Sequence, residues 1–146
     1  MQLVRTVYAS ASASPMTEHE LGTILAKARE TNRRLDVTGL LLYHEGNFLQ
    51  ILEGPAAAVD DLYARIARDR RHSRVLMLQR CDIEARSFGD WRMGFVALDA
   101  AMLSKLPGFV TYGSVPRLFE ELANHAGRVE ALVSAFRDGN FRRAVS

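Results

Sequence analysis

Cysteine is nearly absent from this 146-residue chain: Cys81 is the only one, so no internal disulfide can form. A fold without disulfides fits a reducing compartment. We expect no signal peptide, because Arg5 interrupts a short apolar run and no long hydrophobic segment follows. No apolar stretch approaches the roughly 20 residues that a membrane-spanning helix needs. We therefore expect a soluble, cytoplasmic protein without membrane association.

The chain also lacks a large excess of charge of one sign. Nineteen lysines and arginines stand against 17 acidic residues, which gives a formal net charge of +2. The basic clusters are short, namely Arg33-Arg34, Arg70-Arg71 and Arg142-Arg143. Because nucleic-acid binding calls for an extended basic face, we expect no nucleic-acid partner.

Motifs of common catalytic and cofactor sites are missing as well. The sequence contains no GxGxxG, no GxxxxGK[ST] and no GxSxG. The histidines lack the i, i+4 spacing typical of metal ligands, so no metal site is expected; they are His19, His44, His72 and His125. Cys81 lies at the end of a predicted strand and is expected to be a small packed residue.

Hydrophobic periodicity predicts two helices and five strands within a single domain. Thr17 and Glu20 form a capping box that starts a helix expected to end near Thr31-Asn32. Gly54-Pro55 opens a second helix, with proline at its tolerated first position. Five short apolar runs predict strands, and they occupy residues 2–10, 37–43, 48–53, 72–80 and 93–98.

The resulting order, β-α-β-β-α-β-β, predicts an α+β fold, a ferredoxin-like sandwich with one extra strand. Strand 48–53 carries apolar residues on both faces, so the sheet needs a cover on each side. Two helices cover only one face. Helical spacing at 116–122 and 129–136 predicts a C-terminal helical hairpin on the opposite face. We expect a division into residues 1–98 and a C-terminal extension, 99–146.

Three polar residues lie where a core is expected. Tyr8 has apolar neighbours on the first strand, and a core tyrosine with a satisfied hydroxyl would explain it. Gln50 lies mid-strand between Phe48 and Leu52, so its amide needs a side chain, a water or a ligand as partner. Asn32 fits either a left-handed helix end or a functional role.

Four separated stretches together resemble the BLUF family, blue-light sensors that use flavin adenine dinucleotide, and in particular its short stand-alone members. They are LVRTVYAS (3–10), ARETNRRLDVTGLLLYHEGNFLQILEGP (28–55), DRRH (69–72) and RSFGDWRMGF (86–95). The resemblance covers residues 2–98, and it rests on several motifs in family-like order and spacing.

The resemblance implies a role for each matching residue. Tyr8 corresponds to the photoactive tyrosine, Gln50 to the glutamine between tyrosine and flavin, and Asn32 to the asparagine that bonds the flavin ring. Ile24 and Ile66 correspond to the aliphatic pair that sandwiches the ring. The remaining matches are a polar cluster beside the ring and ribityl chain (Asp69, Arg71, His72) and a pair on the last strand near the glutamine (Trp91, Met93).

By the same resemblance, the cofactor is FAD, although the ring contacts would also accept FMN or riboflavin. The implied function is a light-driven electron and proton transfer from Tyr8, with a rotated or tautomerised Gln50 as the signalling state. The resemblance also implies a sensor without catalytic activity of its own. A downstream protein would receive the signal, and we expect a homo-oligomer.

Other ferredoxin-like functions stay open from the residues alone: a binding module without chromophore, a small acylphosphatase-like hydrolase, or an RNA-binding sheet. The hydrolase needs an arginine-bearing anion loop that Ala11–Ser14 does not supply. The RNA binder needs exposed aromatics and a basic face.

Overall fold

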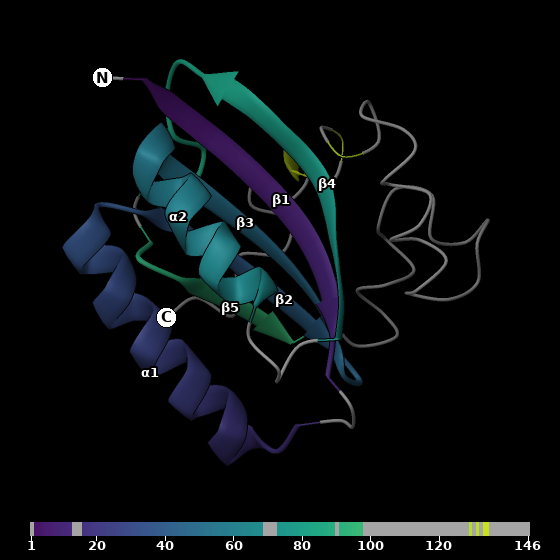
Figure 1. The fold of residues 1–146 in the computed structure, drawn as a ribbon. Helices are drawn as coiled ribbons and strands as arrows, with labels where there is room; N and C mark the ends of the chain where they lie inside the picture. Colours follow the sequence, from purple (N-terminus) through teal and green to yellow (C-terminus); the bar gives the residue numbers. More distant parts are fainter. Residues whose placement is uncertain are drawn as a thin grey trace.

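The computed structural model describes residues 2–12, 16–68, 73–89 and 91–97, together with residues 129, 131, 133 and 134. Its elements follow the predicted order, with two helices laid across one face of a twisted sheet (Figure 1). They are β1 (Leu3–Ala11), α1 (Glu18–Leu35), β2 (Thr38–His44), β3 (Asn47–Pro55), α2 (Ala56–Ala67), β4 (Ser73–Ile83) and β5 (Gly94–Ala97).

The strands form one sheet in the order β4-β1-β3-β2-β5. The pairs β4–β1, β1–β3 and β3–β2 are antiparallel. The edge strand β5 runs parallel to β2. This confirms the ferredoxin-like sandwich with one extra strand. In the register of the two central strands, Tyr8 of β1 lies directly opposite Gln50 of β3. Opposite residues on neighbouring antiparallel strands point to the same face and lie within contact distance.

A two-residue turn joins β2 to β3 and fixes their register. Glu45 and Gly46 both have positive φ angles, 46° and 86°, and His44 pairs with Asn47 on either side of them. Consecutive positive φ angles are typical of the type I′ turn, whose twist matches that of paired strands. The turn at Glu45-Gly46 therefore makes β2 and β3 a hairpin.

Helix α1 begins as predicted and ends later than predicted. The side chain of Thr17 accepts from the Glu20 N–H, and the Glu20 carboxylate accepts from the Thr17 N–H, which confirms the capping box. The predicted end near Thr31-Asn32 is wrong, because the helix continues to Leu35. Asp36 terminates it in the left-handed conformation, φ 58°, which a short polar side chain tolerates. Asn32 thus lies inside the helix and is buried.

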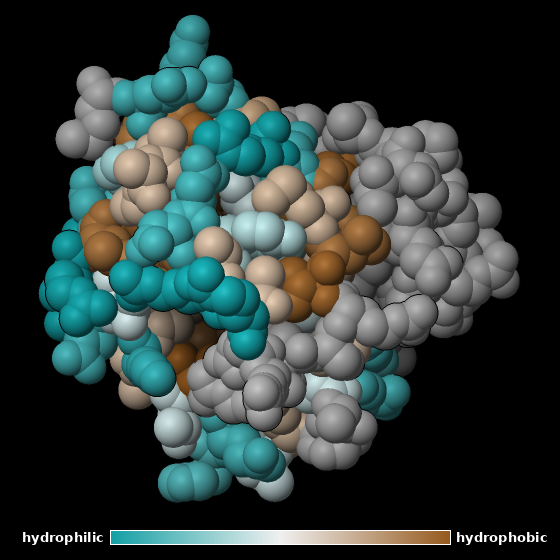
Figure 2. Space-filling model, viewed as in Figure 1, coloured by the Kyte–Doolittle hydropathy of each residue, from teal (hydrophilic) through white to brown (hydrophobic). Residues whose placement is uncertain are grey.

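Both faces of β3 are buried, as the two-sided apolar pattern of strand 48–53 predicts. Phe48 and Leu52 belong to the core between the sheet and the two helices. Leu49 and Ile51, which point to the opposite face, are fully buried too. Figure 2 shows hydrophilic residues over much of the helical side, with hydrophobic residues exposed between them.

The predicted C-terminal hairpin falls almost entirely outside the described residues. Its four described positions have helical backbone, and Val129 and Val133 among them are fully buried. Within the part of the chain that the structure describes, no helix is long and apolar enough to cross a membrane.

Two glycines give opposite stability predictions. A methyl group on Gly39 of β2 would collide with the Ile51 carbonyl oxygen of β3, whereas one on Gly22, exposed in α1, would meet no atom within 4 Å. Gly39→Ala should lower the free energy of unfolding by at least about 2 kcal/mol, because two paired strands must separate. Gly22→Ala should raise it by about 0.5–1 kcal/mol, because alanine loses less backbone entropy in a helix. Urea unfolding followed by circular dichroism measures both, and equal effects would contradict the close approach of β2 and β3 at Gly39.

Candidate functional site

Tyr8 and Gln50 are joined by a hydrogen bond on the helix-facing side of the sheet. The Tyr8 hydroxyl donates to Gln50 Oε1, and both side chains are buried. Burial raises the pKa of the Tyr8 phenol well above its ordinary value, and the neighbouring Tyr63 phenol raises it further. Tyr8 is therefore a neutral donor at every physiological pH. Its ring meets the Tyr63 ring edge to face, with centroids 5.5 Å apart.

The amide nitrogen of Gln50 has a weak partner. Gln50 Nε2 lies 3.5 Å from the Met93 sulfur, and thioether sulfur is a poor acceptor. A buried amide N–H₂ without strong acceptors is unfavourable by about 1–3 kcal/mol. The Gln50 amide can therefore serve a carbonyl or ring nitrogen of a bound molecule.

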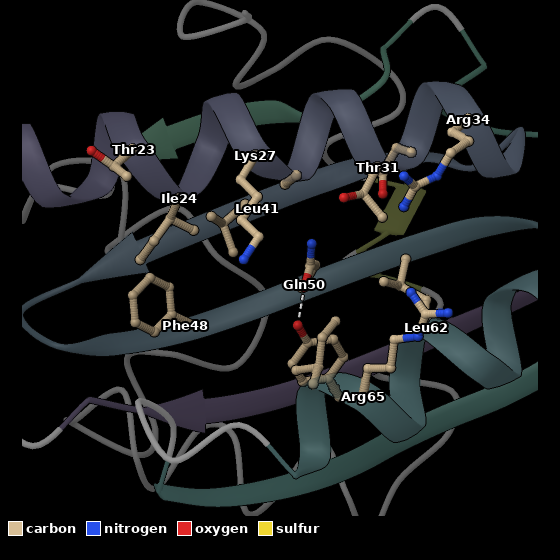
Figure 3. Close-up of a pocket in the computed structure, with 14 residues that line it drawn as sticks. Thr23, Ile24, Lys27, Thr31, Arg34, Leu41, Phe48, Gln50, Leu62 and Arg65 are labelled. Carbon is tan, nitrogen blue, oxygen red and sulfur yellow. Dashed lines mark hydrogen bonds between the residues drawn. The ribbon is translucent and has the colours of Figure 1, made fainter.

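A cavity of about 350 Å³ lies above this pair, between α1, α2 and the strands (Figure 3). Its volume is at the lower end of the range for pockets that hold small molecules. Ile24 of α1 and Ile66 of α2 line it from opposite helices. A flat apolar ring with a polar edge suits such a cavity. The full lining is Tyr8, Thr23, Ile24, Lys27, Ala28, Thr31, Asn32, Arg34, Leu41, Phe48, Gln50, Leu62, Arg65 and Ile66.

Five of the predicted site residues thus line one cavity: Tyr8, Ile24, Asn32, Gln50 and Ile66. Two further predicted residues, Met93 and Trp91, lie just before β5, and the Met93 sulfur lies 3.5 Å from Gln50 Nε2. The predicted polar cluster Asp69, Arg71 and His72 lies outside the described residues. Among the residues that are described, no group of three potential ligands could hold a metal ion.

Sequence reasoning missed three cations of the lining, Lys27, Arg34 and Arg65. The available signal was helical spacing, since Lys27 and Arg34 are seven residues apart and so share a face of α1 with Ile24 and Thr31. A charged residue on a helix is usually solvated, so the sequence offered no reason to place these three cations at a cavity. Their position in the lining follows from the packing of α2 opposite α1.

Met93 and Trp91 occupy different environments just before β5, which starts at Gly94 and not at the predicted Met93. Met93 is fully buried against Gln50. The Trp91 ring stacks on Phe88, with centroids 6.0 Å apart. Gly94 leaves room for it, because an added Cβ there would lie 2.7 Å from a ring carbon of Trp91. Met93 thus contacts the glutamine, and the Trp91 ring packs on Phe88.

Helix α1 holds the backbone of this segment directly. The Asn32 amide donates to the Arg92 carbonyl, and Arg29 Nε donates to the Met93 carbonyl at 3.1 Å. Asn32 also lines the cavity. A change at the cavity wall can therefore reach the start of β5 through Asn32 as well as through Gln50.

A buried ion pair anchors the same segment from the opposite side of the sheet. Glu53 is fully buried; its Oε2 accepts from Arg5 Nε at 3.1 Å and its Oε1 from the Phe88 N–H at 2.8 Å. Arg5 Nη2 also donates to Ser87 Oγ at 2.8 Å. One carboxylate of β3 thus fixes the residue on which Trp91 stacks.

Arg86 adds a second anchor for the loop before β5. Its guanidinium donates to Thr38 Oγ1 at 3.0 Å, to the Glu53 carbonyl at 3.1 Å and to the Asp36 carbonyl at 2.8 Å. It also pairs with the Asp36 carboxylate at 3.2 Å. The loop is therefore tied to the end of α1 and to two strands at once.

This arrangement, a buried tyrosine and glutamine below a cavity between two helices, has known counterparts. The family model described as BLUF, sensors of blue-light using FAD, matches residues 3–94. The chain belongs to the BLUF family. As a BLUF protein it is a blue-light sensor that uses a flavin, and the match is to a sensory domain.

Individual relatives agree with the family match. Photoactivated adenylate cyclase subunit alpha of Euglena gracilis is 40% identical over 88 residues, which are 60% of this chain and only 9% of that protein. The solved structure of BlrB, a BLUF protein in its dark state, has 29% identity and a TM-score of 0.73, and the match covers 94% of this chain and 96% of that one. A bacterial light-regulated adenylyl cyclase has 28% identity and a TM-score of 0.63, over 94% of this chain and 40% of that one.

The effect of breaking the buried Arg5–Glu53 ion pair can be followed through the fluorescence of Trp91, the sole tryptophan. Glu53→Ala leaves the Arg5 charge buried and unpaired, and it should lower the free energy of unfolding by about 3–5 kcal/mol. It should also shift the fluorescence emission of Trp91, because Phe88 loses its anchor. Replacing both partners, as in Arg5→Met/Glu53→Leu, should recover part of the loss.

Asp60→Ala is the matched control for Glu53→Ala. It removes a carboxylate from the exposed pair with Arg80, whose Nε lies 2.8 Å from Asp60 Oδ1. Exposed pairs contribute little, so neither stability nor Trp91 emission should change appreciably. If Glu53→Ala behaved like this control, the anchoring role of Glu53 would be wrong.

Proposed function

We propose that the cavity holds the isoalloxazine ring of a flavin and that Tyr8 and Gln50 carry the photochemistry. The observation that supports this most directly is the buried hydrogen bond from Tyr8 to Gln50 at the floor of a cavity between two helices. Ile24 and Ile66 would contact the two faces of the ring. Gln50 and Asn32 would serve its polar edge, which gives the Gln50 amide the acceptor that it lacks.

A bound flavin would supply the chromophore, which becomes a strong oxidant on absorbing blue light. Tyr8 is then the donor of an electron and a proton. A phenol that loses an electron becomes a strong acid, and the Tyr8 O–H already points at Gln50 Oε1. The proton therefore has one short path, onto the Gln50 amide. The electron and a proton would then return to Tyr8 as the pair recombines, which would restore the phenol and leave only Gln50 changed.

The proposed signalling state is an altered Gln50, either rotated or tautomerised. Each form changes which amide atoms donate and which accept, so Gln50 presents a different edge to the ring and to Met93. An additional donor at the flavin C4 carbonyl would shift the absorption to the red. Reversal in the dark requires only that the amide return to its first arrangement.

The remaining predicted site residues have subsidiary roles in this proposal. Asp69, Arg71 and His72 come soon after α2 and its C-cap Arg68, and they would contact the ring or the ribityl chain. Trp91 would tune the photocycle without being required for it. FAD is the proposed cofactor, with FMN and riboflavin as substitutes that the ring contacts would also accept.

We assign residues 1–98 to the flavin-binding domain and 99–146 to an output extension without catalytic activity of its own. The signal would pass to a separate cytoplasmic protein or to another subunit of a homo-oligomer. The proteins named as photoactivated or light-regulated cyclases show the kind of effector to which related sensors are linked.

The photochemical test compares visible spectra of the purified protein in the dark and under blue light. The wild type should shift reversibly to the red. Tyr8→Phe should bind flavin without any shift, because the donor is gone, and Gln50→Ala should abolish it because no amide remains to rearrange.

Two conservative variants are controls for this test. Tyr63→Phe removes the hydroxyl of the tyrosine that packs against Tyr8 and leaves the hydrogen bond between Tyr8 and Gln50 in place. Trp91→Phe alters the ring stacked on Phe88. Both variants should keep the red shift. A full photocycle in Tyr8→Phe would exclude Tyr8 as the donor. A colourless protein that takes up no flavin would leave a plain binding module as the function.

The proposed relay is tested by light-dependent hydrogen exchange. Illumination should change exchange at the amides of 91–97 and in 98–146, because Met93 contacts Gln50 and Asn32 holds the Arg92 carbonyl. Strand β4, at the opposite edge of the sheet, is the internal control and should change little. Changes confined to the cavity lining would contradict a route through β5.

A further inference from the structure

Arg29 of α1 reaches the backbone of the segment before β5, where its Nε donates to the Met93 carbonyl at 3.1 Å. Figure 1 shows α1 on the side of the sheet where β5 is the edge strand, and α2 over β1 and β3. Position 29 follows the buried Leu25 by four residues and precedes the buried Asn32 by three, so the three share one face of the helix. Arg29 does not line the cavity, so its contact with Met93 is separate from the proposed cofactor site.

Arg29 uses its charge differently from most arginines of this chain. Partial burial lowers the pKa of the Arg29 guanidinium below its ordinary value. Within the described part of the chain it has no carboxylate partner, and its donor serves a backbone carbonyl instead. A hydrogen bond from a charged donor is roughly twice as strong as one between neutral groups. The arginines that do pair with a carboxylate are Arg5, Arg65, Arg80, Arg86 and Arg92.

Met93 is thereby held at two atoms by two different elements. Its carbonyl is bonded to Arg29 of α1, and its sulfur lies 3.5 Å from Gln50 Nε2 of β3. The residue is fully buried, and the next one, Gly94, begins β5 and pairs with Leu40 of β2. The Met93 side chain therefore cannot withdraw from Gln50 unless the backbone leaves α1 or β2.

We infer that Arg29 is a positioning residue that holds Met93 against Gln50 and so sets how long the light-induced state lasts. The inference rests on the proposed function and adds a control on the rate of dark reversal. In the structure, Gln50 Nε2 offers N–H donors to the sulfur, a weak acceptor. Rotation of the amide would put Oε1, which only accepts, against the sulfur. Tautomerisation would move one of the two N–H protons to the amide oxygen.

Either change to the amide weakens its contact with the Met93 sulfur. If Met93 could move away, the altered Gln50 would be relieved of this poor contact and would persist. Because Arg29 prevents the withdrawal, the altered state stays less stable and returns faster. Arg29 would therefore shorten the lifetime of the signalling state without taking part in the electron or proton transfer.

The test measures how fast the red-shifted absorption decays in the dark, in the full chain with bound flavin. Arg29→Met removes the donor and keeps a long side chain of good helix propensity. The red shift should keep its wild-type size, because Tyr8 and Gln50 are intact. Dark recovery should slow by about three- to tenfold, the range that one ordinary hydrogen bond corresponds to.

Two single variants are controls. Arg33→Met makes the same substitution one turn further along α1, at an exposed residue, and its recovery rate should stay within about twofold of the wild type. Arg29→Lys keeps the charge and an N–H donor on a flexible chain, so it should also recover at nearly the wild-type rate. Urea unfolding of all three variants checks that the recovery rate does not simply follow stability.

A double-mutant cycle decides whether Arg29 acts through Met93. Met93→Leu removes the sulfur and nearly conserves the volume of the side chain. In this background Arg29→Met should change the recovery rate by less than about twofold, because the contact that Arg29 controls is already gone.

Four results would each overturn the positioning role. They are unchanged or faster recovery in Arg29→Met, an equal slowing in Arg33→Met, an equal slowing in Arg29→Lys, and an undiminished effect of Arg29→Met in the Met93→Leu background. A wild-type protein that binds flavin and shows no red shift would instead overturn the proposed function itself.

Discussion

The hydrogen bond between Tyr8 and Gln50 joins the two central strands of the sheet at the point where both side chains are buried beneath the helices. It exists because β1 and β3 pair in a register that sets these residues opposite each other. A buried phenol and a buried amide both need partners, and here each satisfies part of the other's need. Gln50 also lines the cavity, and its Nε2 contacts the Met93 sulfur. The orientation of the Gln50 amide therefore affects both the cavity and Met93.

Those consequences depend on how firmly the segment before β5 is held. Glu53 fixes Phe88 from the opposite side of the sheet, Arg86 ties the loop to the end of α1 and to β2, and Asn32 holds the Arg92 carbonyl. Met93 is the residue of this segment that touches the glutamine. These contacts hold the segment before β5 at several points and join it to the glutamine at Met93.

The same sandwich occurs in solved BLUF structures that differ greatly in length. BlrB is matched over nearly its whole chain, whereas the bacterial light-regulated adenylyl cyclase is matched over 40% of its length. Both proteins share with this chain the sheet and the two helices across it. The sheet with its two helices is therefore one structural module that occurs in chains of very different length.

The sequence alone determined the element order, the capping box at Thr17, the two-sided burial of β3 and the choice of Tyr8 and Gln50 as residues that need an explanation. These depend on nearest-neighbour physics, since alternation, helical spacing and turn chemistry act over a few residues. The end of α1 was predicted too early, because asparagine at position 32 is also typical of a helix end. The helix in fact continues through residues 33–35.

Only the tertiary structure decided that Asn32 lies inside α1, buried and bonded to the segment before β5. It also decided that Met93 contacts Gln50 while the Trp91 ring stacks on Phe88, and that Lys27 and Arg34 line a cavity together with residues of α2. Each of these depends on the packing of segments distant in sequence, and no local pattern fixes how such segments meet.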